Sequence, residues 1–308
     1  MPGRKPPDHP ITSAASVLRL YWIVFRNPRF RRRYLRLIGN IFRIYFKPQF
    51  FRRRGHTRIP LDMELDGLVP FDPTWLPCYL GFVRLWVGSL GWLHVRFGDR
   101  ALPEMEAFVA GLETLFLEAH KIFSQRDSTV ASRPGPLPSL ESLIIHLSDR
   151  NSFCFPSLHV MIARYNARRI GASLDRLGGP GEDFSAEKAF LEERALRIVE
   201  SIIHVKQHSL SDIPAGLFLL HTLSAEGEAR NGDEAEDDLR FLERLFLEAE
   251  KTEPGADGER GRKLRSFMGA MYRRLHHAHR SGRNPHAVLL DFLGNYREEV
   301  GILLKNLG

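Results

Sequence analysis

Cysteine is almost absent from this 308-residue chain, which contains only Cys78 and Cys154. Neither has a metal-ligand partner at short spacing, so the sequence predicts neither a disulfide framework nor a metal site built on cysteine. So few cysteines are typical of a protein in a reducing compartment.

Long uncharged hydrophobic runs are also missing, because no stretch of 18 residues is both apolar and free of charge. Residues 73–95 come nearest, interrupted by Arg84 and His94. They could form a single spanning helix, but a buried or interfacial helix is favoured. The first apolar stretch, 17–25, is followed by "RNPRFRRR" rather than by small residues, so no signal peptide is expected.

Strand-like alternation is scarce, whereas apolar residues recur at helical spacing. Apolar residues make up 43% of the chain, which favours a globular fold. The pattern predicts an all-α fold. We expect helices at 102–123, 140–147, 157–177, 185–207, 213–224, 236–251, 261–280 and 286–306.

Acidic residues are nearly absent from the N-terminal part. Residues 1–58 hold 15 Lys and Arg against one acid, Asp8, which gives +14 and leaves −7 for the other 250 residues. Ten aromatic side chains alternate with these basic residues. This mixture suits an anionic membrane surface. A solvated helical face and nucleic acid remain alternatives, but no nucleic-acid recognition motif is present, so no specific nucleic acid is expected.

The segment "SIIHVKQHSLSD", 201–212, places Ser201, His208 and Asp212 at offsets that share one face of a helix. A carboxylate one turn from a histidine can accept a hydrogen bond from one ring nitrogen and leave the other neutral and nucleophilic. A surface His–Asp pair is the simpler interpretation. Pro214 leaves open a third geometry, in which Asp212 caps a new helix.

The segment "FPSLHV", 155–160, places Ser157 at a helix N-terminus, where free backbone N–H groups favour an anion. His159 lies in the first turn, where the helix dipole disfavours its charged form and a bound phosphate would restore it. It could then donate a proton to a leaving oxygen. Alone, this segment indicates only a capped helix.

The two segments together resemble the histidine-dependent type 2 phosphatidic acid phosphatases, a family that includes bacterial acid phosphatases and vanadium haloperoxidases. The family pattern reads KxxxxxxRP, then PSGH, then SRxxxxxHxxxD; here "RDSTVASRP", 126–134, stands in the first place. The inositol-phosphotransferase-like branch is closer still. Its members commonly read "DNPYNAFPSLHV" and "STLFTKQHYVVDVLAG", where this chain has "DRNSFCFPSLHV" and "SIIHVKQHSLSDIPAG". The resemblance covers about residues 60–222.

The resemblance implies roles for individual residues. His208 would attack phosphorus, Asp212 would orient it, and His159 would protonate the leaving group and later activate water. The phosphoryl oxygens would be held by Arg126, Arg133, Ser157 and Ser201. This mechanism requires no metal and no other cofactor.

The chain departs from the family pattern at several positions. Arg126 replaces Lys, Leu158 replaces Gly as in the branch, and Ile202 replaces the Arg of the third motif. Lys206 is a candidate replacement ligand, although two residues from His208 it would point away on a straight helix. The expected helices around 161–177 and 186–200 also carry many charges, each costing about 2.5–3.5 kcal/mol at a bilayer centre. We therefore expect a bundle of this family with polar outer helices, plus extra N- and C-terminal helices.

The chain is predicted to comprise a basic aromatic segment at 1–58, a phosphatase-like helical core at 59–225, and an acidic linker with C-terminal helices at 226–308. The expected function is hydrolysis or transfer of a phosphate ester, including a lipid phosphate, through a phosphohistidine. The alternative is a catalytically silent helical module that binds an anionic ligand or membrane. The expected location is the cytoplasmic side of a membrane through residues 1–58, or else the soluble cytoplasm.

Overall fold

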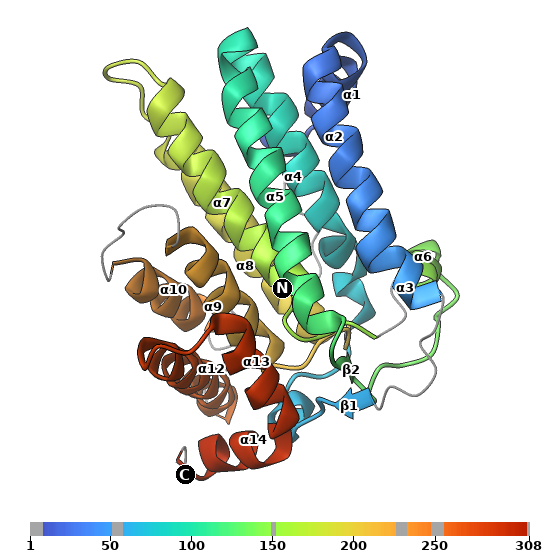
Figure 1. Ribbon diagram of the computed structural model, residues 1–308, viewed down its shortest axis with the longest axis vertical. Helices are drawn as coiled ribbons and strands as arrows, with labels where there is room; N and C mark the ends of the chain where they lie inside the picture. The colour runs from blue at the N-terminus through green and yellow to red at the C-terminus, as the bar shows by residue number, and fades with distance from the viewer. Residues whose placement is uncertain (1–8, 51–57, 149–151, 226–232, 248–255, 307–308) are drawn as a thin grey trace.

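The structure is a computed structural model that describes residues 9–50, 58–148, 152–225, 233–247 and 256–306. Helices account for most of these residues, so the all-α prediction is confirmed. Figure 1 shows long helices side by side in the upper part and the C-terminal helices below them. The helices are α1 (Ala14–Arg26), α2 (Pro28–Ile41), α3 (Lys47–Phe50), α4 (Leu76–Phe97), α5 (Leu102–Phe123), α6 (Leu140–Ser148), α7 (Leu158–Leu177), α8 (Ser185–His204), α9 (Asp212–Ala225), α10 (Asp233–Arg244), α12 (Ala256–Arg280), α13 (Pro285–Gly294) and α14 (Tyr296–Lys305).

The N-terminal helices belong to the bundle. A Cβ atom on Gly91 of α4 would stand 1.7 Å from the carbonyl oxygen of Ser16, and one on Gly88 would stand 2.4 Å from that of Ile11. Only glycine permits backbone to approach backbone so closely. Residues 9–50 of the basic segment thus pack against the core, while its residues 1–8 and 51–57 lie outside the described ranges.

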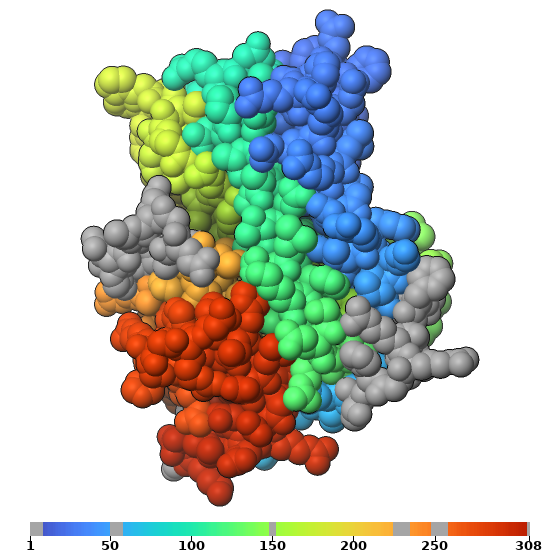
Figure 2. Space-filling view, viewed as in Figure 1, coloured from blue at the N-terminus to red at the C-terminus, as the bar shows by residue number. Residues whose placement is uncertain are grey.

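Helix α4 forms the centre of the upper bundle. Its residues from Leu85 to His94 are all buried, as the buried-helix interpretation of 73–95 predicted. Within the described ranges, no helix combines the length and the apolar character that crossing a bilayer requires. Figure 2 shows α5 as a column between the N-terminal helices and the C-terminal helices.

Two short parallel strands, which the sequence did not predict, lie at the lower end of the bundle. β1 (Arg58–Pro60) pairs with β2 (Asp127–Thr129), and Ser128 also forms a bridge to Phe153. Strands of three residues are too short to show alternation. They matter because they fix the segment after α5 beside the one that leads into α7.

The charged faces of α7 and α8 pair with each other and with α10. Arg164 is 2% exposed and its guanidinium binds the carboxylates of Glu192, Asp237 and Asp238. An unpaired buried charge would cost several kcal/mol, roughly 3–5 when one partner is removed. The polar helices of the prediction therefore carry charge into the protein interior as well as to its surface.

Several predicted boundaries were wrong. The helix expected at 236–251 ends at Arg244, and the one expected at 261–280 begins at Ala256. The helix expected to run through Gln207 ends at His204, and Lys206 has a left-handed backbone with φ of 55°. The expected helix 286–306 breaks at Asn295 into α13 and α14. The acidic stretch 226–238 is not a linker throughout, because α10 begins at Asp233; residues 226–232 lie outside the described ranges.

Candidate active site

His208 and Asp212 form a buried hydrogen-bonded pair, but not on one helix face as the spacing suggested. His208 lies in the loop after α8, and Asp212 is the first residue of α9. The Nδ1 atom of His208 lies 2.9 Å from Oδ2 of Asp212 and 3.0 Å from the carbonyl oxygen of Cys154. A backbone carbonyl can only accept, so Nδ1 carries the proton and Nε2 keeps its lone pair. The alternative in which Asp212 starts a new helix is the one observed.

Asp212 is fully buried, and burial raises the pKa of its carboxyl group. Hydrogen bonds from His208 and from the amide of Ser209 oppose that rise. These hydrogen bonds fix the orientation of the His208 ring. They also favour the tautomer that carries its proton on Nδ1.

Ser157 caps α7 as predicted. Its hydroxyl accepts from the amide of Val160 and lies 3.4 Å from Nε2 of His208. The lone pair of His208 is thus directed toward the N-terminus of a 20-residue helix, where backbone N–H groups favour an anion.

The rings of His159 and His208 meet edge to face, with 5.5 Å between centroids and 69° between planes. Tyr79 and Phe82 of α4 enclose His159, each with a centroid 4.4 Å away. Burial, and secondarily His208, holds the pKa of His159 well below 6.5. Its Nε2 is buried without a hydrogen-bond partner among the described residues. His159 is therefore a neutral imidazole with one unpartnered nitrogen, and its ring lies next to that of the proposed nucleophile.

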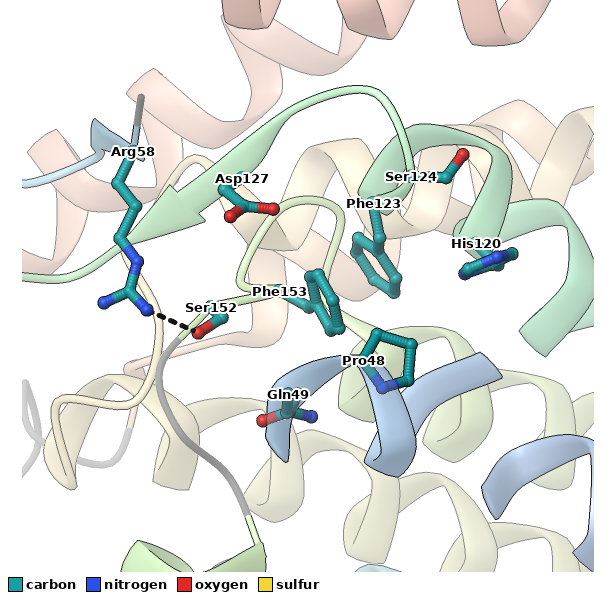
Figure 3. A pocket seen from close by; sticks show the side chains of 9 residues that line it. All are labelled: Pro48, Gln49, Arg58, His120, Phe123, Ser124, Asp127, Ser152 and Phe153. Atoms are coloured by element: carbon teal, nitrogen blue, oxygen red, sulfur yellow. Dashed lines mark hydrogen bonds between the residues drawn. The ribbon is translucent and has the colours of Figure 1, made fainter. Parts of the chain in front are cut away.

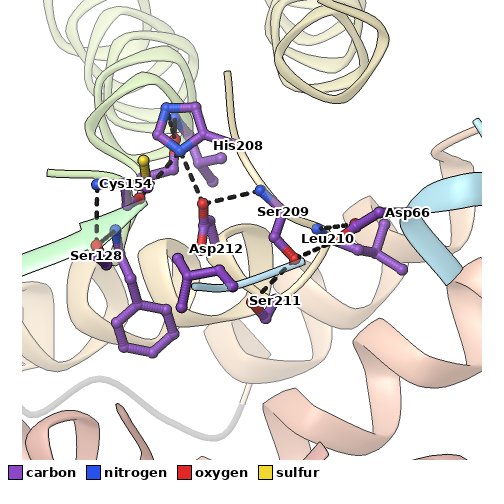
Figure 4. Close-up of polar contacts among 12 residues, drawn as sticks. Asp66, Ser128, Cys154, His208, Ser209, Leu210, Ser211 and Asp212 are labelled. Atoms are coloured by element: carbon purple, nitrogen blue, oxygen red, sulfur yellow. Dashed lines mark hydrogen bonds and ion pairs between the residues drawn. The ribbon is translucent and has the colours of Figure 1, made fainter. Parts of the chain in front are cut away.

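A second group of residues, which the sequence analysis missed, holds this pair in place (Figure 4). The hydroxyl of Ser128 accepts from the amides of Cys154 and Phe155 and so fixes the carbonyl group that binds His208. Asp66 accepts from the amide of Leu210 at 2.8 Å and from the hydroxyl of Ser209 at 2.8 Å. The loop that carries His208 is thus tied on both sides. No short motif predicts these contacts, because they join residues far apart in the chain.

The C-terminal helices also support this loop. The hydroxyl of Tyr296 lies 2.9 Å from that of Ser211 and donates to the carbonyl oxygen of Leu61 at 2.5 Å. The ring of Phe292 stacks on Phe155 with 6.0 Å between centroids. Residues beyond the resembling region therefore contribute to the candidate site.

The five predicted phosphate ligands differ in position. Ser157 faces His208, as described above. Ser201 is buried, and its hydroxyl donates to the carbonyl oxygen of Ile198 in its own helix. Lys206 points away from the histidines, because its Nζ donates to the carbonyl oxygens of Asp66 and Val69.

The two arginines of the first segment lie apart. The guanidinium of exposed Arg126 lies against Gly294 at the end of α13. Arg133 is half-buried, and the next residue, Pro134, lines a small hollow together with Val205 and Gln207. The chain around Arg133 therefore approaches the loop of His208, whereas the side chain of Arg126 is directed to the C-terminal helices.

A separate small hollow lies at the lower end of α5 (Figure 3). Arg58 lines one side of it and donates to the hydroxyl of Ser152 at 3.2 Å. Its lining comprises Pro48, Gln49, Arg58, His120, Phe123, Ser124, Asp127, Ser152 and Phe153, and thus none of the predicted site residues. Across the described ranges, no three His, Cys, Asp or Glu side chains are grouped so that they could hold a metal ion.

Comparison with known protein families, with curated protein sequences and with solved structures found no match to this chain.

Proposed function

We propose that this protein hydrolyses or transfers a phosphate ester through a phosphohistidine at His208. The observation that carries the proposal is the opposition of two histidines. His208 has its Nδ1 proton held by a carbonyl and a carboxylate, and its Nε2 contacts the hydroxyl of Ser157 at a helix N-terminus. The ring of His159, whose Nε2 has no hydrogen-bond partner among the described residues, lies next to the ring of His208.

The chemistry follows from these atoms. A phosphate ester bound at the start of α7 would present phosphorus to Nε2 of His208. A P–N bond forms as the P–O bond to the leaving group breaks, and the leaving oxygen takes a proton from protonated His159. Neutral His159 then removes a proton from water or an acceptor alcohol, whose oxygen attacks phosphorus. The P–N bond breaks, and phosphate or a new ester leaves.

The first step needs a proton on His159 that the resting protein disfavours, because burial lowers the pKa of this histidine. A bound phosphate dianion would raise that pKa by Coulombic attraction. Substrate binding and uptake of one proton should therefore be coupled. This coupling would keep His159 neutral in the empty site.

The proposed family is that of the type 2 phosphatidic acid phosphatases, in its inositol-phosphotransferase-like branch. The opposition of the two motif histidines supports this assignment, as do the Ser157 cap and the His208–Asp212 contact. Ile202 counts against it, since a fully buried isoleucine stands where the pattern has an arginine. We propose a bundle of that family with charge-paired outer helices.

A single-turnover quench experiment tests the proposal. The protein is mixed with a ³²P-labelled alkyl phosphate, quenched in alkali and digested. A base-stable, acid-labile phosphoryl group on the peptide that contains His208 is expected. A phosphoryl group on any other residue would contradict the mechanism.

The second candidate function is a catalytically silent module of the same fold that binds an anionic ligand or membrane. It is favoured by the loss of an arginine at Ile202 and by the engagement of Lys206 with backbone carbonyls. Vanadate mimics the phosphoryl transition state. Tight vanadate binding without turnover of any tested phosphate ester would favour this candidate.

We further propose that α1 and α2 contact an anionic membrane surface. On α1, Trp22 is 46% exposed and Phe25 is 75% exposed. Arg26, Arg29 and Arg36 are exposed on the same two helices. Apolar side chains between arginines are suited to the headgroup region, where each basic residue contributes about 1 kcal/mol. A lipid phosphate could then be drawn from the surface to which the protein binds.

A further inference from the structure

Two arginines of α8 face α4 with unused hydrogen-bond donors. Arg194 and Arg197 lie three residues apart and so share a helix face. Arg194 is 6% exposed. Its Nε and Nη1 atoms, and Nε of Arg197, are buried without a hydrogen-bond partner among the described residues. A buried donor left without a partner costs about 1–3 kcal/mol, and more when charged. A bound acceptor would remove that cost.

The first turns of α4 lie opposite these two arginines. The Cβ position of Gly81 lies 3.1 Å from Nη2 of Arg194, so any larger residue would press on the guanidinium. The thiol of Cys78 hydrogen-bonds to Arg197, and the ring of Trp75 lies 5.6 Å from its Cζ. A glycine, a thiol and an aromatic ring enclose the two cations without supplying a negative charge.

Two carboxylates lie near this contact, since Glu193 acts on Arg194 and Glu200 acts on Cys78. No ion pair joins Arg194 or Arg197 to a carboxylate within the part of the chain that the structure describes. The carboxylate of Glu200, one turn along α8, accepts from the amide of Phe246 at 2.6 Å. Burial lowers the pKa of Arg194; Cys78 and Glu193 oppose this shift, whereas Arg197 and Arg84 add to it. Burial also raises the pKa of the Cys78 thiol, which stays uncharged.

The arginines lie at the same level of the bundle as the two histidines. α4 and α8 run antiparallel, because Trp75 stacks on His204 while Gly81 meets Arg194. The same turn of α4 carries Tyr79 and Phe82, whose rings enclose His159. The arginine pair and His159 therefore contact neighbouring faces of the same stretch of α4.

We propose that Arg194 and Arg197 form a phosphate-binding site between α4 and α8 that holds a phosphate group of the substrate. The identity of the ligand rests on the proposed function, but the site itself rests on the buried donors of Arg194 and Arg197 that have no hydrogen-bond partner among the described residues. Two phosphate groups fit this chemistry. One is the phosphate that is transferred, for which the pair would replace the arginine lost at Ile202, and the other is a second phosphate on the same molecule.

Calorimetric titration of the full chain with orthophosphate and with methylenebisphosphonate tests the site. The titration uses His208→Ala as the background, so that it requires no turnover and stays independent of the phosphohistidine. Arg194→Met and Arg197→Met should each weaken bisphosphonate binding on the order of tenfold or more. Lys188→Met is the matched control on α8, since Lys188 pairs with Asp175 at the surface, and it should change neither affinity.

The two ligands distinguish the two sources. Loss of orthophosphate binding in the arginine variants identifies the transferred phosphate. Loss confined to the bisphosphonate identifies a second phosphate. Gly81→Val, which presses on the guanidinium of Arg194 without removing charge, should weaken binding of the same ligand. It tests the site if an arginine variant fails to fold. Unchanged affinity for both ligands in folded Arg194→Met, Arg197→Met and Gly81→Val would overturn the proposal.

Discussion

The amide of Ser157 donates to the carbonyl oxygen of Asp212 at 3.3 Å. This backbone bond joins the start of α7 to the start of α9, so the two helix N-termini lie together with His208 between them. The hydroxyl of Ser157 and the carboxylate of Asp212 then contact opposite nitrogens of the same imidazole ring. The orientation of His208 is therefore set by backbone geometry as well as by side chains.

The two histidines should respond differently to substitution. General acid catalysis typically contributes about 10²–10⁴-fold and matters less for a weakly basic leaving group. His159→Ala should therefore retain most activity on an activated aryl phosphate and lose it on an alkyl phosphate. His208→Ala should lose both, and Asp212→Asn should fall between them. Steady-state rates on both substrates measure this, and full activity of His208→Ala would exclude the mechanism.

Arg133 and Arg126 should differ in their effect on vanadate inhibition. Arg133 precedes the proline that lines the hollow beside Gln207, whereas the guanidinium of Arg126 lies against Gly294. Arg133→Ala should raise the inhibition constant for vanadate by about tenfold or more, the loss expected for a hydrogen bond to a charged group. Arg126→Ala is the control and should change it little. Equal small effects from both would remove residues 126–134 from the phosphate site.

Ser128 should contribute to stability through the segment that it fixes. Its hydroxyl is the acceptor for two buried amides, and Ser128→Ala leaves both without it. We expect a loss of about 1–3 kcal/mol in the free energy of unfolding, measured by urea denaturation. Ser132→Ala is the control on the exposed continuation of the same segment and should have almost no effect. If Ser128→Ala left the free energy of unfolding unchanged, the segment would be held by other contacts.

His204 should make stability depend on pH. Burial lowers its pKa to about 4, and its ring stacks on Trp75 at 4.6 Å. In the unfolded chain it protonates as pH falls through 6.5, but in the folded protein only near 4. The free energy of unfolding is therefore not reduced by His204 above pH 6.5, and it decreases as the pH falls from 6.5 toward 4. His204→Phe keeps an aromatic ring and should flatten the pH dependence across that interval, as denaturation at several pH values would reveal. An unchanged slope would contradict this account.

Vesicle binding should depend on the exposed aromatic residues of α1. Replacing Trp22 and Phe25 together by serine should weaken co-sedimentation with vesicles that contain phosphatidylserine. Salt should weaken binding of the unaltered protein, since it screens the arginines. Ile302→Ser, a change of an exposed apolar residue on α14, is the control. Equal binding by the double variant and the control would exclude α1 as the membrane contact.

The sequence by itself determined the helical character of this protein and several of its helices. The predicted 102–123 coincides with α5, and Ser157 caps α7 as expected. These features are local, because helix periodicity and N-capping depend on residues within about one turn of each other. The contact between His208 and Asp212 was also local enough to be predicted from spacing, although the wrong backbone was assumed.

The positions of the phosphate ligands could not be predicted in this way. Lys206 has a left-handed backbone and turns its amine toward Asp66 and Val69, which no local pattern indicated. The orientation of Arg126 toward α13 depends on helices outside the resembling region. Long side chains reach whichever partner the packing brings near them, so their direction follows from distant elements.

Tertiary structure alone decided the surroundings of the two histidines. Tyr79 and Phe82 reach His159 from α4, Ser128 fixes the carbonyl that binds His208, and Tyr296 reaches the same loop from the C-terminal helices. The unpartnered donors of Arg194 and Arg197 likewise became recognisable only when α4 covered them. The physical reason is burial. A polar group exposed to water forms hydrogen bonds with water, so only the packing shows which buried donors and acceptors remain available to a ligand.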